Sequence, residues 1–151
     1  MGIAQLQQTL ASHPLICVDT MIWIYLLDEH PQYVDLAAAV FALIEQGSSQ
    51  GVTSTLTLAE LLTAPARAGD TQALQDYELY VTNFPTLQLL PPNVAIARQT
   101  ALVRAGTGLK TPDAIQIATA IHAGASALVS NDKRWRNKVN RPALILLDDY
   151  L

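Results

Sequence analysis

Four carboxylates stand where a hydrophobic run ends or a helix begins, which is where α/β proteins place their reactive side chains. They are Asp19, Glu60, Asp113 and Asp132. Like charges within a few ångströms of each other raise one another's pKa values unless a cation neutralises them. The three histidines and the single cysteine show no ligand spacing, so this all-oxygen set favours Mg²⁺ or Mn²⁺. Such a site can activate water and stabilise charge on a phosphate, as metal-dependent nucleases do.

Neutral oxygens accompany these acids. Thr20 follows the first acid directly, while Ser130 and Asn131 precede the last one, Asp132. We expect these three residues to orient the carboxylates or to complete the surroundings of a bound cation.

Each acid also has a purely structural interpretation. Glu60 with Thr57 fits a capping box, in which the carboxylate would bind the Thr57 amide. Asp113 in a first helical turn would favour the helix dipole. Asp19 and Asp132 could each cap the helix that follows. The four interpretations together require four independent coincidences at one end of the sheet, so we favour a shared site.

A basic segment follows Asp132 directly. Its bases are Lys133, Arg134, Arg136 and Lys138, and Trp135 stands among them. Bases interleaved with an aromatic ring are typical of contact with single-stranded nucleic acid. The alternative is a short amphipathic helix with a solvated basic face, and we expect Trp135 to pack inward in either case. Residues 1–97 hold nine acidic residues and one base, so the remainder of the protein repels phosphates.

Five short apolar runs predict the strands that would position these residues. The runs are Leu15–Val18, Gly51–Ser54, Leu87–Leu90, Ala127–Ser130 and Ala143–Leu147. Runs that are apolar throughout are typical of strands buried on both faces of a parallel sheet. The segments between them keep helical spacing, with helices expected near residues 21–27, 34–44, 57–62, 71–81, 92–105 and 111–123. This alternation predicts an α/β fold whose ligands bind beyond the carboxyl ends of the strands.

Length and composition agree with such a fold. The 151 residues fit a single domain spanning 1–151, with 50% hydrophobic and 15% charged residues. Cys17, the single cysteine, excludes an intramolecular disulfide and is expected in a buried strand. No apolar stretch approaches the ~18 residues of a membrane span, and no secretory signal is visible. We therefore expect a cytoplasmic protein with no membrane partner.

The acidic positions resemble the motifs of the PIN (PilT N-terminus) domain nucleases over nearly the whole chain from Leu15. The similarity rests on Val18-Asp19-Thr20, Glu60, Thr111-Pro112-Asp113-Ala114 and Ser130-Asn131-Asp132. Two features depart from the pattern. Lys110 stands where many toxins of the family carry an arginine, and Met1–His13 precede the usual first strand.

The resemblance implies a three-layer α/β/α fold with a central, mainly parallel sheet of about five strands. It further implies that Asp19, Glu60, Asp113 and Asp132 bind Mg²⁺ or Mn²⁺ and hydrolyse RNA. Members of this length are similar to VapC-type toxins, which implies a cognate antitoxin and a homodimer. We expect part of the first two helices, including the apolar stretch Met21–Leu27, or the fourth helix, to form the dimer contact. Trp23 is expected either in the core or in this contact.

Other functions stay open at this point. They include a housekeeping RNA-processing nuclease of the same family, a non-catalytic α/β binding module and a flavodoxin-like signalling domain. The presence of all four acids counts against the binding module and the signalling domain. A non-catalytic protein gains nothing from placing carboxylates close together, where their charges repel each other.

Overall fold

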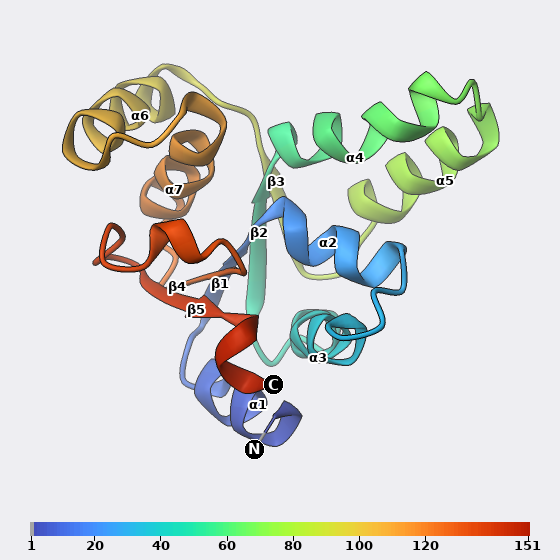
Figure 1. Ribbon diagram of the computed structural model, residues 1–151, viewed down its shortest axis with the longest axis horizontal. Helices are drawn as coiled ribbons and strands as arrows, with labels where there is room; N and C mark the ends of the chain where they lie inside the picture. Colours follow the sequence, from blue (N-terminus) through green and yellow to red (C-terminus); the bar gives the residue numbers. More distant parts are fainter. Residues whose placement is uncertain (1) are drawn as a thin grey trace.

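Short aliphatic and β-branched runs form five strands at the centre of the molecule (Figure 1). The computed structural model describes residues 2–151. The strands are β1 Leu15–Val18, β2 Gln50–Ser54, β3 Leu87–Leu90, β4 Ala127–Ser130 and β5 Ala143–Leu146. They lie in the order β3-β2-β1-β4-β5, and every pairing is parallel. The predicted α/β fold is confirmed, with strand bounds within a residue of the apolar runs.

The helices alternate with these strands. They are α1 Ile3–Ala11, α2 Thr20–Leu27, α3 Val34–Glu45, α4 Thr55–Arg67, α5 Thr71–Thr82, α6 Val94–Thr107 and α7 Thr111–Ala123. Two short 3-10 helices, η1 Lys133–Trp135 and η2 Leu147–Tyr150, flank β5. Side-chain caps fix several starts: Asp70 accepts from the Ala73 amide in α5, and Asn93 from the Ile96 amide in α6. Gly108 ends α6 in the left-handed conformation that glycine adopts without strain.

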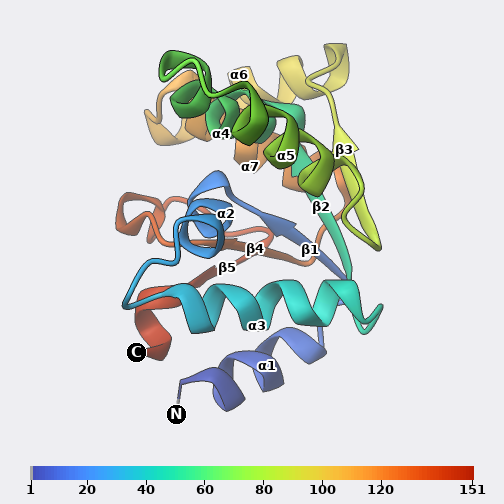
Figure 2. The ribbon, with the colours of Figure 1, turned by 90° about the vertical axis from the view of Figure 1, so that its right-hand side faces the viewer.

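The sheet separates two helical layers (Figure 2). Alternate side chains of each strand point to opposite faces, so neighbouring residues enter different cores. Ile16 and Val18 pack with α1, α2 and α3, whereas Cys17 and Leu128 pack with α6 and α7. The predicted three-layer arrangement and the buried position of Cys17 are confirmed.

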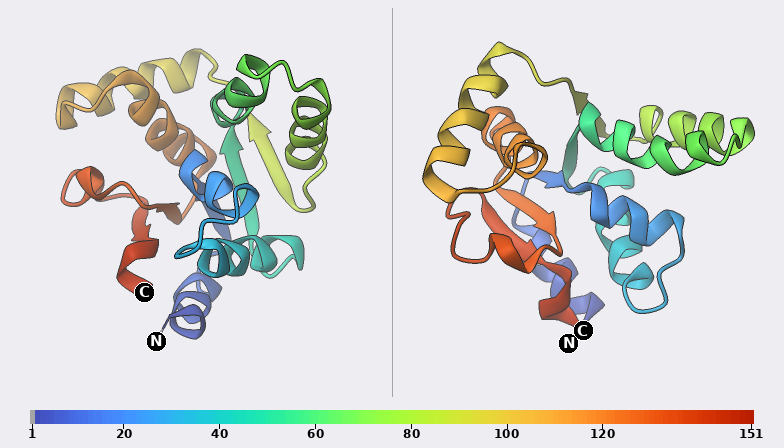
Figure 3. Two further views of the ribbon diagram at one scale, coloured as in Figure 1. Left: turned by 45° about the vertical axis from the view of Figure 1, so that its right-hand side comes forward. Right: turned by 45° about the horizontal axis from the view of Figure 1, so that its top comes forward.

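The first core is rich in aromatic contacts. Trp23 of α2 is fully buried, and its ring lies 4.3 Å from that of Phe41 and 5.5 Å from that of Phe84. Of the two places expected for Trp23, the core and the dimer contact, its buried ring occupies the core. Among the described residues, α4 and α5 form a helical hairpin that projects from the body (Figure 3).

Helix α1 is an element that the sequence interpretation did not assign. Its inward side chains, Leu6 and Leu10, are fully buried against the core that includes α3. The Tyr150 hydroxyl lies 3.3 Å from that of Thr9, which links α1 to η2. The additional helix thus covers the core on the side of the sheet that carries α3 (Figure 2).

A close approach between α3 and the sheet occurs at Gly51 of β2. A Cβ atom built there would lie 2.7 Å from Cδ1 of Leu87 and 2.9 Å from Cδ1 of Ile44. Side chains essentially never make such short contacts, so this strand position accommodates only glycine without displacement of its neighbours.

Within residues 2–151, the longest apolar helix falls short of what a bilayer crossing requires.

Candidate metal centre and its surroundings

The carboxyl ends of β1 and β4 bring the first and last acids together. These central strands are neighbours, with Val18 paired to Val129. Asp19 Oδ2 accepts a hydrogen bond of 2.7 Å from the Ser130 hydroxyl, which in turn accepts one of 3.1 Å from the Asp132 amide. Ser130 therefore connects the carboxyl ends of β1 and β4 and the acids that follow them.

Asp19 is the most deeply buried of the acids. The residue is 7% exposed, and its Oδ1 accepts a 2.8 Å hydrogen bond from the Thr20 amide at the start of α2. Burial raises the pKa of Asp19 to about 7, although the bonds from Ser130 and Thr20 favour the charged form. The charges of Glu60 and Asp113 raise this pKa further. Asp19 thus caps a helix and faces the other acids at the same time.

Glu60 joins the site through hydroxyl groups. Its Oε1 accepts a 3.0 Å hydrogen bond from Thr20, whose hydroxyl lies 2.8 Å from that of Thr57. The capping-box alternative for Thr57 and Glu60 is wrong. Helix α4 begins earlier, with the Ser54 hydroxyl accepting from the Leu56 amide, so Thr57 lies inside the helix and faces the core.

A residue that the sequence interpretation missed completes this hydroxyl network. Gln116 of α7 is 2% exposed, and its Nε2 donates to Thr20 at 3.1 Å and to Thr57 at 2.9 Å. Its Oε1 is buried and has no partner among the described residues. The available signal was a lone glutamine between Ile115 and Ile117, one helical turn after Asp113.

Asp113 and Asp132 form the outer part of the site, where Arg134 lies between them. The Arg134 Nε donates to both Asp132 carboxylate oxygens, at 2.9 and 3.1 Å, and its Nη2 contacts Asp132 and lies 3.3 Å from Asp113 Oδ2. Arg134 lowers the pKa of Asp132. Burial raises the pKa of Asp113, against the opposing charge of Arg134.

All four acids line one cavity of about 200 Å³. It is lined by Asp19, Thr20, Met21, Ile24, Glu60, Pro112, Asp113, Gln116, Asp132 and Arg134. The predicted acids thus converge from β1, α4, α7 and the end of β4.

The residues present fit a hard divalent cation in their chemistry. The donors are carboxylate and hydroxyl oxygens, and Gln116, whose buried Oε1 has no partner among the described residues, belongs to the same lining. As they lie here, no three carboxylates in residues 2–151 are close enough to hold a metal ion together. The cation found among them is Arg134.

The predicted neutral oxygens divide between two locations. Thr20 and Ser130 contact the acids directly. Asn131 instead donates to the Tyr25 hydroxyl at 3.1 Å and accepts from the Asp148 amide at 2.8 Å, so it ties the loop after β4 to α2 and η2.

The basic segment is largely engaged with acids of the same chain. Lys133 pairs with Asp148 at 2.7 Å, and Arg136 pairs with Asp149 at 2.8 Å. No such ion pair forms at Lys138 within the part of the chain that the structure describes. Trp135 is 1% exposed, which confirms that its ring packs inward. These exposed ion pairs stabilise the protein little and can exchange for other anions.

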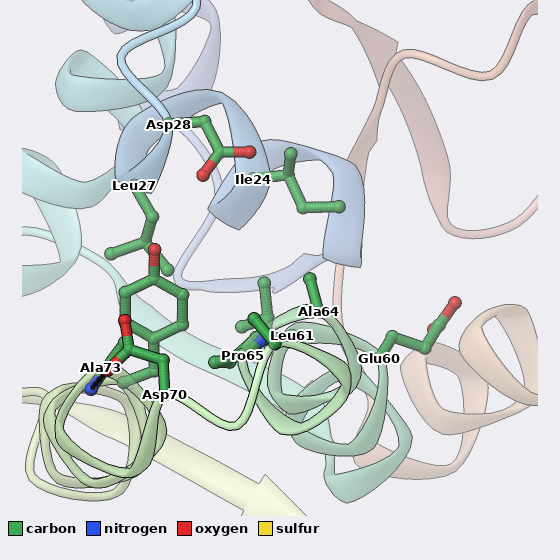
Figure 4. Close-up of a pocket in the computed structure, with 11 residues that line it drawn as sticks. Ile24, Leu27, Asp28, Glu60, Leu61, Ala64, Pro65, Asp70 and Ala73 are labelled. Atoms are coloured by element: carbon green, nitrogen blue, oxygen red, sulfur yellow. Dashed lines mark hydrogen bonds between the residues drawn. The ribbon is translucent and has the colours of Figure 1, made fainter.

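A second, larger cavity of about 340 Å³ adjoins this site, between α2 and the α4–α5 hairpin (Figure 4). Its lining is mainly apolar, with Ile24, Leu61 and Pro65 among the contributors. Its charged lining residues are all acidic, namely Asp28, Glu60 and Asp70. Ile24 and Glu60 line both cavities, so the two lie on either side of these residues.

Comparison with known proteins gives one family and one fold. The model of the PIN domain family matches residues 16–140. No curated protein sequence matches the chain.

Solved structures of the same fold come from several bacteria. A chain of VapBC2 from Rickettsia felis, bound to a DNA fragment from their promoter, has a TM-score of 0.70 and 17% identity, covering 87% of this chain and 98% of that one. A chain of VapBC-1 from nontypeable Haemophilus influenzae has a TM-score of 0.66 and 21% identity, with coverage of 89% and 98%. VapC20 from Mycobacterium tuberculosis, a Sarcin-Ricin loop cleaving toxin, has a TM-score of 0.63 and 16% identity, with coverage of 81% and 94%.

Proposed function

Because this chain belongs to the PIN domain family, we propose that it is a metal-dependent endoribonuclease and the toxin of a toxin–antitoxin pair. The observation that carries this proposal is the convergence of four carboxylates on one cavity at the carboxyl edge of the sheet. The similarity in fold to VapC20, a toxin that cleaves the Sarcin-Ricin loop, supports an RNA substrate.

Asp19, Glu60, Asp113 and Asp132 would hold one or two Mg²⁺ or Mn²⁺ ions. Bound there, the metal supplies a Lewis acid that lowers the pKa of an attacking water and stabilises charge on the phosphate. Ser130 and the Thr20 amide orient the Asp19 carboxylate, and Gln116 holds the Thr20 hydroxyl toward Glu60. The buried Asp19 must lose a proton below about pH 7 before it can accept a cation.

The substrate we propose is single-stranded RNA, because unpaired bases can be splayed out and read. The basic segment follows Asp132 directly, so phosphates that reach the cavity also reach this segment. Lys133, Arg134, Arg136 and Lys138 would neutralise the RNA backbone, the first three after leaving the acids with which they pair within the chain. A cytoplasmic location fits this substrate.

The partner we propose is an antitoxin protein that covers the cavity of Figure 4. An apolar lining with only acidic charges favours a peptide that combines apolar and basic side chains. The structural neighbours named VapBC support such a partner. We also propose a homodimer, for which α5 offers the exposed Leu79 and Tyr80 and α6 the exposed Leu102.

The test is cleavage of a panel of labelled single-stranded RNAs by the purified protein with Mg²⁺, with Mn²⁺ and with a chelator. We expect metal-dependent cleavage by the wild-type protein and none by Asp132→Asn. Induced expression in a bacterial host should arrest growth with the wild-type protein only. Cleavage that persists in the chelator would contradict the metal mechanism, and cleavage without growth arrest would favour a housekeeping nuclease.

A further inference from the structure

Arg134 lies between two of the acids that we propose as metal ligands. Its guanidinium bridges the carboxylates of Asp132 and Asp113, two of the four acids around the cavity, and it lines that cavity itself. The chain thus contributes its own cation to the acidic site.

We propose that Arg134 is an internal counter-ion that competes with the metal for Asp113 and Asp132, and that metal binding releases its guanidinium to an RNA phosphate. This inference rests on the proposed function, since it presumes that the acids bind a metal and that the substrate is RNA. It adds a residue whose partner changes between the two states of the site.

The contacts of Arg134 explain why the acids are stable without a metal. The two outer carboxylates would repel each other unless a positive charge lay between them. Arg134 provides that charge with three nitrogen-to-oxygen contacts on Asp132 and one on Asp113. The same contacts occupy carboxylate oxygens of Asp132 and Asp113 that a metal ion would otherwise use.

The release of Arg134 needs only a side-chain movement. Its side chain is 64% exposed, and exposed ion pairs contribute little to stability. The neighbouring Trp135 is 1% exposed and anchors η1 in the core, so the backbone can stay in place. A guanidinium that leaves two carboxylates has the planar donor geometry that binds a phosphate with two hydrogen bonds.

Arg136 is a matched control within the same segment. It also forms a two-point contact with a carboxylate, at 3.2 and 2.8 Å to Asp149, and its side chain is 48% exposed. It does not line the acidic cavity. Arg136→Gln therefore removes the same charge at almost the same distance along the chain without vacating the carboxylates.

The first experiment measures Mn²⁺ affinity by calorimetry for the wild-type protein, Arg134→Gln and Arg136→Gln. We expect Arg134→Gln to bind Mn²⁺ roughly three- to fivefold more tightly, which is the upper end of the scale of one exposed ion pair. Arg136→Gln should stay within about twofold of wild type, because long-range charge effects are screened. Equal affinity in the wild-type protein and Arg134→Gln, or an equal gain in both variants, would overturn the competition. Circular dichroism shows that each variant is folded before titration.

The second experiment measures the affinity for a phosphorothioate oligouridylate with and without Mn²⁺. We expect Arg134→Gln to weaken binding mainly when Mn²⁺ is present, since only then is the wild-type guanidinium free. Arg136→Gln should weaken binding equally in both conditions. A loss in Arg134→Gln that is the same with and without Mn²⁺ would overturn the release.

The outcomes separate this inference from the proposed function. Tighter Mn²⁺ binding in Arg134→Gln, with no RNA cleaved by the wild-type protein, supports the competition and contradicts the nuclease. RNA cleavage with unchanged Mn²⁺ affinity in Arg134→Gln contradicts only the competition. Absence of Mn²⁺ binding in every variant overturns both.

Discussion

Asp19 and Asp132 follow neighbouring strands of the same sheet, yet their surroundings act on them in opposite directions. Asp19 comes directly after the central strand β1 and is almost fully buried, and burial raises its pKa to about 7. Asp132 comes two residues after β4, where Arg134 can reach it, and the guanidinium lowers its pKa. Two acids of one site thus differ in what they need before they can bind a metal.

The difference lies in the kind of partner that each carboxylate has. Asp19 accepts hydrogen bonds from neutral groups, an amide and the Ser130 hydroxyl, which orient it without cancelling its charge. Asp132 has a formal positive charge in contact. A metal that enters the site must therefore displace a proton from the inner acid at low pH and an arginine from the outer one.

The largest expected effect is on catalysis, where the two acids should behave alike. Asp19→Asn and Asp132→Asn should each reduce RNA cleavage by more than about 100-fold, the scale that a single catalytic group contributes. Gel assays of labelled RNA with saturating Mg²⁺ measure this loss. Wild-type cleavage in either variant would return that residue to a helix-capping role.

Asp19 and Asp132 should differ in how they make the free energy of unfolding depend on pH. In the metal-free protein, Asp19 is protonated below about pH 7, whereas in the unfolded chain it ionises near 3.8, the ordinary pKa of an aspartate. The folded state then holds the extra proton between these values, so this group makes the free energy of unfolding fall as pH rises through that window. A tenfold change in an ionisation constant corresponds to about 1.4 kcal/mol, so the loss of stability is on the order of several kcal/mol.

Denaturant melts at about pH 5.5 and about pH 8 test this difference. We expect Asp19→Asn to be more stable than the metal-free wild-type protein at both pH values, with roughly twice the gain at the higher one, because the wild-type protein loses stability from about pH 4 up to about pH 7. Asp132→Asn should be slightly less stable at both, because it loses a pair with Arg134 and no buried charge. A stabilising effect of the same size in both variants would remove the contrast between the two acids.

Metal binding should reflect the proton on Asp19 as well. A ligand that binds only the folded state, at 100 times its Kd, adds about 2.7 kcal/mol of stability. Saturating Mn²⁺ should thus raise the Tm by several degrees, more at about pH 8 than at about pH 6, where a proton must be displaced first. Differential scanning fluorimetry measures both shifts. An unchanged Tm at millimolar metal in the folded protein would count against the centre.

The smallest expected effect concerns the basic segment. Each phosphate contact with single-stranded RNA contributes roughly −0.7 to the slope of log affinity against log salt. Arg134→Ala with Arg136→Ala should flatten this slope and weaken binding across many RNA sequences. Arg67→Ala, which removes a base at the end of α4, serves as the control. If the slope does not change in the double variant, the RNA path lies elsewhere, near Arg98, Arg104 and Lys110.

The sequence predicted the sheet and the convergence of the four acids on one edge of it, because both depend on local signals. Strands buried on both faces are continuous apolar runs, so their ends, and the acids after them, are visible in the sequence. The rule that ligands bind beyond the carboxyl ends of parallel strands placed Asp19 and Asp132 at the same edge of the sheet. It did not fix the strand order, and the structure shows that β1 and β4 are neighbours.

The partners of the site residues were less predictable. Thr57 and Glu60 have capping-box spacing, but Ser54 precedes them and starts the helix earlier, which leaves Thr57 in the hydroxyl network. In the sequence, Gln116 is a polar residue within an apolar helix face. Its role becomes visible only in the structure, where it contacts Thr20 and Thr57. The sequence identifies Arg134 only as one base of an exposed basic segment. The order of residues does not show which acids its side chain contacts.

The close approach at Gly51 has a practical consequence for genetics. Gly51→Ala would add a methyl group between Ile44 and Leu87, on a strand that neighbours β1 but carries none of the four acids. Overpacking of this kind costs typically about 1–3 kcal/mol, and in a chain of this length that lowers the melting temperature by several degrees. The substitution therefore offers a thermolabile allele. Its product is folded at permissive temperature with all four acidic residues unchanged, and it unfolds on warming.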